Sequence, residues 1–112
     1  MEENNLGTSS TGINPTVAGL LCYLVGFVTG IIFLIIEKDN KFVRFHAMQS
    51  VLAFGFLFVL QVVLTFIPFL GWALLWVLHI VTLVVWILLM VKAYKGEYYK
   101  LPIVGDMAEQ KI

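Results

Sequence analysis

Chemically capable side chains gather in residues 37–50, a polar stretch between two long apolar segments. Five of them could form a small polar site at a membrane edge: Glu37, Arg44, His46, Gln49 and Ser50. His46, Gln49 and Ser50 have the i, i+3, i+4 spacing that places side chains on one face of a helix. Such a cluster could bind a lipid headgroup, an ion or a partner peptide. Alternatively, it caps the chain and anchors it to lipid phosphates, which is the commoner role of such residues at a membrane edge.

A second polar pair, Gln61 and His79, lies inside the apolar segments. An ionisable residue within a membrane is a functional-site hypothesis by default. The alternative is a neutral His79 hydrogen-bonded to Gln61, which stabilises helix contacts by only ~0.6 kcal/mol on average. We favour this alternative, because a path across the ~30 Å bilayer core would need more than two polar groups.

No pattern in the chain indicates a metal site, a cofactor site or an enzyme. His46 and His79 should differ in depth by more than about 15 Å at the helical rise of ~1.5 Å per residue. The lone Cys22 lies on another predicted helix, and neither a Ser-His-Asp nor a His-Glu-x-x-His arrangement is present. We therefore expect no catalytic residue, no metal, no cofactor and no identifiable small-molecule substrate.

The composition is that of a membrane protein. Of the 112 residues, 61% are hydrophobic and 12% are charged, with a mean hydropathy of +0.97. Soluble domains have roughly half apolar and a quarter charged residues, so this chain has too little polar surface to cover a globule. The net charge of zero argues against nucleic-acid binding.

Three uncharged windows are long enough to cross a bilayer, which requires about 20 helical residues. They are residues 17–36, 48–67 and 72–91. The sequence therefore predicts an all-α membrane domain over 15–100 with three transmembrane helices and a connector at 37–47. Pro68 and Gly71 suit a very short turn, which makes the second and third helices a tight hairpin. This hairpin places Gln61 and His79 at matched depth.

Three glycines of the first window, Gly19, Gly26 and Gly30, fall on one helical face. Small residues on one face allow close approach of another membrane helix. We therefore predict a packing face, whose partner helix could belong to the same chain or to another.

Charge asymmetry predicts the orientation. Residues 1–14 form a polar tail without Lys or Arg, for which we expect mobility and no cleaved signal peptide. All seven cations lie in the connector or after residue 91: Lys38, Lys41, Arg44, Lys92, Lys95, Lys100 and Lys111. Cationic loops stay in the cytoplasm, so three spans place the N-terminal tail outside and the connector and the tail 101–112 in the cytoplasm. That last tail could dock on the connector or lie on the membrane.

Three runs indicate a family: TGIIFLIIEK at 29–38, NKFVRFHAMQS at 40–50 and GEYYKLPIVGD at 96–106. Over residues 15–109 the chain resembles small uncharacterised prokaryotic multi-pass membrane proteins. These are grouped with the membrane subunit of the chloroplast inner-envelope import translocon, the Tic-like group. The resemblance implies no enzyme activity and no catalytic residue. Relatives include a magnetosome membrane protein, which implies a role in membrane organisation.

These observations favour a non-enzymatic, multi-pass protein of the cell membrane that acts as an organising or accessory assembly subunit. Its expected partners are the lipid bilayer and either further copies of itself or other membrane proteins. The alternative is a subunit of an oligomeric transporter or protein-translocation channel, in which Gln61 and His79 line the path.

Overall fold

The computed structural model describes residue 7 and residues 10–110. This part of the chain is all-α, with five helices and no strand: α1 (Pro15–Leu24), α2 (Phe27–Ile36), α3 (Lys41–Thr65), α4 (Leu70–Tyr94) and α5 (Val104–Gln110). Asn14 and Asn40 begin α1 and α3, each accepting a backbone N–H with its side-chain oxygen, which is the usual cap of a helix start. The predicted fold class is confirmed in its all-α character.

Two helices, α3 and α4, are long and apolar enough to cross a membrane. Each has 25 residues, or about 37 Å at the α-helical rise, against a bilayer core of ~30 Å. Within the most apolar window of each helix, 28% of α3 and 6% of α4 is buried. Core helices of soluble proteins are mostly buried, so the exposure of these helices fits a lipid environment.

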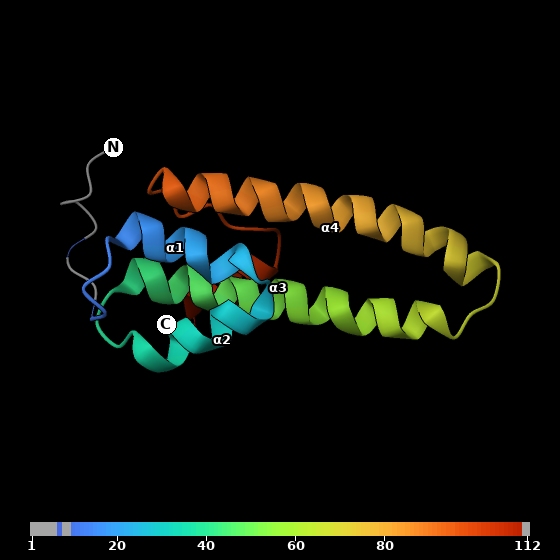
Figure 1. Cartoon of the computed structure of the whole chain (residues 1–112), viewed down its shortest axis with the longest axis horizontal. Coiled ribbons are helices and arrows are strands. Elements are labelled where there is room, and N and C mark those ends of the chain that lie inside the picture. Colours follow the sequence, from blue (N-terminus) through green and yellow to red (C-terminus); the bar gives the residue numbers. More distant parts are fainter. Residues whose placement is uncertain (1–6, 8–9, 111–112) are drawn as a thin grey trace.

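The prediction of a third span over residues 17–36 is wrong, because this window forms two helices of ten residues each. The chain reverses at Gly26, whose φ of 60° and ψ of −137° belong to the first central position of a type II′ turn, where glycine dominates. In Figure 1, α1 runs toward the middle of the molecule and α2 returns toward the end from which α1 started. Ten residues extend about 15 Å, so this helical hairpin reaches only halfway across a bilayer.

Side chains from distant parts of the chain stabilise the break between α1 and α2. The Ser50 hydroxyl donates to the Gly26 carbonyl at 2.8 Å, and the Trp86 indole N–H donates to the Tyr23 carbonyl at 2.6 Å. Thr29 donates to the Cys22 carbonyl at 3.1 Å. Backbone groups freed by a helix break must find partners where water is absent, and α3 and α4 provide two of them.

The N-terminal segment and the connector lie at the same end of the molecule. The backbone N–H of Ser10 donates to the two carboxylate oxygens of Glu37, at 3.0 and 2.8 Å. The sequence predicts the N-terminal tail and the connector on opposite sides of the membrane, and the contact between Ser10 and Glu37 does not fit that separation. The rest of the predicted mobile tail lies mostly outside the described residues.

Burial divides the molecule into two halves. The buried residues of α3 all lie between Phe42 and Phe54, and those of α4 are Leu89, Ala93 and Gly71 beside the turn. Figure 1 shows α1, α2 and the C-terminal segment gathered around the first half of α3, whereas the remainder of α3 and α4 extends beyond them. We call these the packed half and the two-helix half.

The predicted tight hairpin joins α3 to α4 across residues 66–69. The positive φ of this turn is at Phe69 (63°), and Gly71 is not among the glycines with positive φ. Gly71 serves close packing instead, because a Cβ there would overlap the Leu64 carbonyl oxygen.

Candidate functional site

The polar cluster predicted over 37–50 does not form one open site. His46, Gln49 and Ser50 are fully buried, as is Glu37, and Arg44 is half-buried. Within the packed half these residues form separate groups, and each group makes hydrogen bonds to a different part of the chain. His46 and Gln49 join Tyr23 of α1, whose side chain is also fully buried.

The hydrogen bonds of His46 define its tautomer. Its Nε2 lies 2.8 Å from the Glu97 carbonyl oxygen, which can only accept, so Nε2 carries the proton. Its Nδ1 lies 2.5 Å from the Tyr23 hydroxyl and accepts from it. The Tyr23 oxygen in turn accepts an N–H of Gln49 at 2.9 Å. This chain of bonds requires a neutral imidazole.

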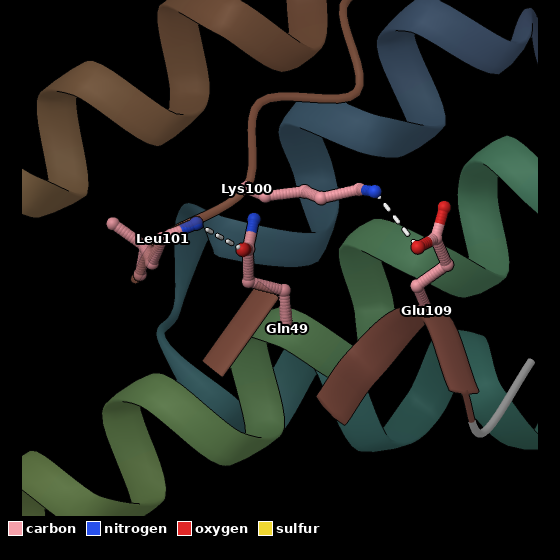
Figure 2. A network of polar contacts seen from close by, with 4 residues as sticks. All are labelled: Gln49, Lys100, Leu101 and Glu109. Atoms are coloured by element: carbon pink, nitrogen blue, oxygen red, sulfur yellow. Dashed lines mark hydrogen bonds and ion pairs between the residues drawn. The ribbon is translucent and has the colours of Figure 1, made fainter. Parts of the chain in front are cut away.

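Gln49 binds the backbone of the C-terminal segment with both ends of its amide. Its Nε2 donates to the Tyr99 carbonyl at 2.9 Å, and its Oε1 accepts the Leu101 N–H at 2.9 Å. Figure 2 shows the amide of Gln49 directed at Leu101 where the segment passes α3. Both N–H groups of Gln49 are therefore used, and the C-terminal segment packs on the first half of α3. The sequence leaves open docking on the connector or a position on the membrane.

An ion pair joins the extended part of the docked segment to α5. Lys100 Nζ lies 2.7 Å from a carboxylate oxygen of Glu109 on α5 (Figure 2), and this hydrogen bond raises the pKa of Lys100. The Tyr98 ring packs against Phe42 and Phe45 of α3, with centroid distances of 5.1 and 5.3 Å. Backbone hydrogen bonds and ring contacts thus hold the segment on α3. The Lys100–Glu109 ion pair joins two parts of the segment, and a second ion pair, Lys92–Glu97 at 3.4 Å, joins it to α4.

Glu37 and Arg44 organise the connector. The Glu37 carboxylate accepts the backbone N–H of Asn40 at 3.0 Å, in addition to that of Ser10. Arg44 Nη1 donates to the backbone carbonyls of Leu34 and Glu37, at 3.2 and 2.7 Å. A cation at the last carbonyls of α2 satisfies acceptors that the helix itself cannot.

The three glycines of the predicted packing face have two different roles. Gly19 and Gly30 lie against α3 of the same chain: a Cβ at Gly30 would be 2.9 Å from the Ala47 carbonyl oxygen, and one at Gly19 would be 3.0 Å from the Phe42 ring. Gly26 forms the break instead, and a Cβ there would meet nothing closer than 3.8 Å. Its glycine is required by backbone conformation and not by helix approach.

Gln61 and His79 lie in the two-helix half, on facing helices. Gln61 Nε2 is 3.4 Å from His79 Nδ1, the long limit for a hydrogen bond. His79 is exposed and Gln61 half-buried. His79 also lines an open hollow of about 330 Å³ together with Thr82, Trp86 and the helix break at Gly26.

Residues 2–108 match the magnetosome magnetite crystal formation protein family. The chain belongs to this family. It is 50% identical over 105 residues to a UPF0132 membrane protein of Methanocaldococcus jannaschii, covering 94% of each chain. It is 49% identical over 100 residues to a UPF0132 membrane protein of Archaeoglobus fulgidus, covering 89% of this chain and 97% of the relative. No solved structure matches.

Membership of the magnetosome magnetite crystal formation family corrects the expected resemblance. The expected resemblance to small membrane proteins and to a magnetosome protein agrees with this membership. The expected grouping with the chloroplast import translocon has no support. The names of these relatives agree with the apolar composition and the two long helices in indicating a membrane protein.

For this family member, Tyr23 is the central residue of the buried network that sequence reasoning missed. One signal was present: a tyrosine in an apolar helix must find a partner for its hydroxyl when buried. Its partners, however, are 23 and 26 residues away. Among the described residues, no group of three His, Cys, Asp or Glu side chains gathers to hold a metal ion.

Proposed function

We propose that this protein is a non-enzymatic membrane protein that organises other membrane helices around its two-helix half. The uncovered polar pair Gln61–His79 is the observation on which this rests. A membrane-embedded amide has more hydrogen-bonding groups than one long contact satisfies, and lipid offers none. A further helix, from a second copy or another protein, would supply the missing partners.

The state of the other polar residues supports a non-enzymatic role. His46, Gln49 and Tyr23 are buried and bonded to one another and to the chain's own backbone. A general base must reach the proton that it removes from a substrate, and His46 has both ring nitrogens engaged. The family name describes a formation process and not a reaction, which agrees with an organising role.

Charge supports an orientation with the packed half at the cytoplasmic side. The Lys and Arg of the described residues all lie at that end or in the segment docked there: Lys38, Lys41, Arg44, Lys92, Lys95 and Lys100. The turn at 66–69 has neither residue type. Since cationic loops stay inside, both described ends of the chain would face the cytoplasm.

Energy transfer between donor- and acceptor-labelled copies in phospholipid vesicles tests the assembly. We expect transfer in the native chain and its loss in a variant with both Gln61→Leu and His79→Leu. Thr65→Val is the matched control. The exposed Thr65 hydroxyl donates to the backbone carbonyl of Gln61 within the same helix, so it already has a partner. Unchanged transfer in the double variant would contradict assembly through the polar pair.

A single variant, His79→Leu, separates assembly from transport. If Gln61 and His79 lined a path in an oligomer, His79→Leu would abolish solute flux through vesicles while energy transfer persisted. That result would favour a transporter subunit and would contradict the organising role.

A further inference from the structure

We propose that this chain is a one-sided membrane wedge, which favours bilayers that are convex on the side of its packed half. The inference rests on the membrane insertion in the proposed function, but not on assembly. A wedge is a body that displaces more lipid from one leaflet than from the other. Three features of the structure support it: helix lengths, the distribution of exposed apolar residues and the location of the cations.

The lengths of the helices restrict α1 and α2 to one leaflet. With ten residues each, they extend about 15 Å, half of the ~30 Å bilayer core. The tip at Gly26 packs beside Phe54, near the middle of the 25-residue α3. The described part of the molecule is elongated, with overall extents of 50 × 25 × 21 Å, and only α3 and α4 continue past this level (Figure 1).

The outer surfaces of α1 and α2 place this hairpin inside the hydrocarbon and not above it. Large apolar side chains remain exposed along α2 and at the last residue of α1: Val28, Ile31, Ile32, Ile35 and Ile36 on α2, and Leu24 on α1. A soluble surface rarely exposes so continuous an apolar patch. The break at its tip is satisfied by side chains, as a backbone in lipid requires. The hairpin therefore displaces lipid.

The two leaflets would thus accommodate different numbers of helices. One contains α1, α2, α3, α4 and the docked C-terminal segment, and the other contains only α3 and α4. For helices about 10 Å in diameter, the cross-section differs roughly twofold between the leaflets. Insertion that expands one leaflet favours curvature toward that leaflet, as it does for amphipathic helices lying in one interface. With the cations at the packed end, the expanded leaflet is the cytoplasmic one.

The orientation of the chain in vesicles of different diameter tests the wedge. Lys38→Cys places a thiol at the exposed packed end, and the native Cys22 is fully buried. The variant is reconstituted at about one copy per vesicle into phosphatidylcholine vesicles of about 50 nm and about 400 nm in high salt. An impermeant thiol reagent then measures the outward fraction. The low density removes assembly, and neutral lipid with salt removes charge effects.

We expect the outward fraction to rise severalfold relative to the inward fraction in the small vesicles, whose outer leaflet is strongly convex. An outward fraction that does not depend on diameter, or that falls in small vesicles, would overturn the wedge. Pro68→Cys at the turn reports the opposite end. Full labelling of both cysteines in intact vesicles would mean that the chain does not insert, and would overturn both proposals. Absence of energy transfer between copies of the native chain, with the orientation bias intact, would overturn only the assembly.

Two matched variants assign the bias to shape. Phenylalanine at four exposed valines of the two-helix half enlarges the narrow end: Val59, Val63, Val77 and Val84. Phenylalanine at four exposed positions of α2 enlarges the broad end: Val28, Ile31, Ile32 and Ile35. The first variant should reduce the outward bias in small vesicles and the second should increase it. Equal bias in the two variants would overturn the wedge.

Discussion

At the scale of single residues, the buried amide of Gln49 connects three parts of the chain. It donates a hydrogen bond to the hydroxyl of Tyr23 on α1 and binds the backbone of the C-terminal segment at Tyr99 and Leu101. Each of these groups is removed from water, and a buried group without its partner is costly. The stability of the packed half should therefore be sensitive to this one side chain.

Gln49→Ala should release the C-terminal segment. It leaves the Tyr99 carbonyl and the Leu101 N–H without partners, and we expect a loss of roughly 1–3 kcal/mol in the free energy of unfolding. Thermal unfolding in detergent measures the loss, and limited proteolysis after Lys100 measures the release. Gln61→Ala is the control, since this amide has no contact with the segment; equal proteolysis of the two variants would contradict the docking role.

Gly30→Ala should destabilise the contact between α2 and α3. The added Cβ would lie 2.9 Å from the Ala47 backbone oxygen, and overpacking of this kind costs typically 1–3 kcal/mol. Gly55→Ala on α3 is the control, because a Cβ there meets nothing within 4 Å and alanine is the better helix former by about 0.5–1 kcal/mol. The melting temperature should fall for the first variant and hold or rise for the second. The opposite order would mean that α2 does not pack on α3 as described.

At the scale of elements, the hairpin of α1 and α2 depends on a single backbone conformation. The φ of 60° at Gly26 lies in a region that side-chain-bearing residues avoid. Hydrogen bonds from Ser50 and Trp86 stabilise the break around it. The reversal of the chain between α1 and α2 is therefore stabilised by side chains of α3 and α4.

Gly26→Ala should destabilise this hairpin although there is space for the methyl group. Strained conformations of this type cost of order 1–3 kcal/mol, and we expect a melting temperature below that of the native protein in detergent. Val28→Ala, which removes an exposed side chain from α2, should change it little. A native melting temperature for Gly26→Ala would show that the chain does not reverse at this residue.

At the scale of the whole molecule, the proposed insertion through α3 and α4 would place both described ends of the chain on one side of the membrane. Ser10→Cys and Lys38→Cys should react alike with an impermeant thiol reagent, because Ser10 bonds to the connector at Glu37 and Asp39. Pro68→Cys, in the turn between α3 and α4, should react from the opposite side. Labelling in intact and in permeabilised cells measures the difference. Opposite labelling of Ser10→Cys and Lys38→Cys would restore three spans.

Composition and residue order alone predict the apolar character, the all-α class, the short turn near Pro68 and the gathering of the cations in the connector and after residue 91. These properties depend on composition and on the order of residues along the chain, so a short stretch of sequence is enough to predict each of them. The spacing of Gln61 and His79 from the turn likewise placed them at matched depth, and their side chains lie 3.4 Å apart.

Contacts between distant parts of the chain, which no local pattern predicts, turn residues 17–36 back and dock the C-terminal segment on α3. An average over the window cannot distinguish a glycine that packs from one that breaks a helix, and the groups that stabilise the break, on Ser50 and Trp86, are 24 and 63 residues from the carbonyls that they bind. His46 and Gln49 bind backbone atoms of residues 97–101, which every residue type offers, so no side-chain pattern marks them as partners. Long-range hydrogen bonds to the backbone thus decided the topology that local hydropathy could not.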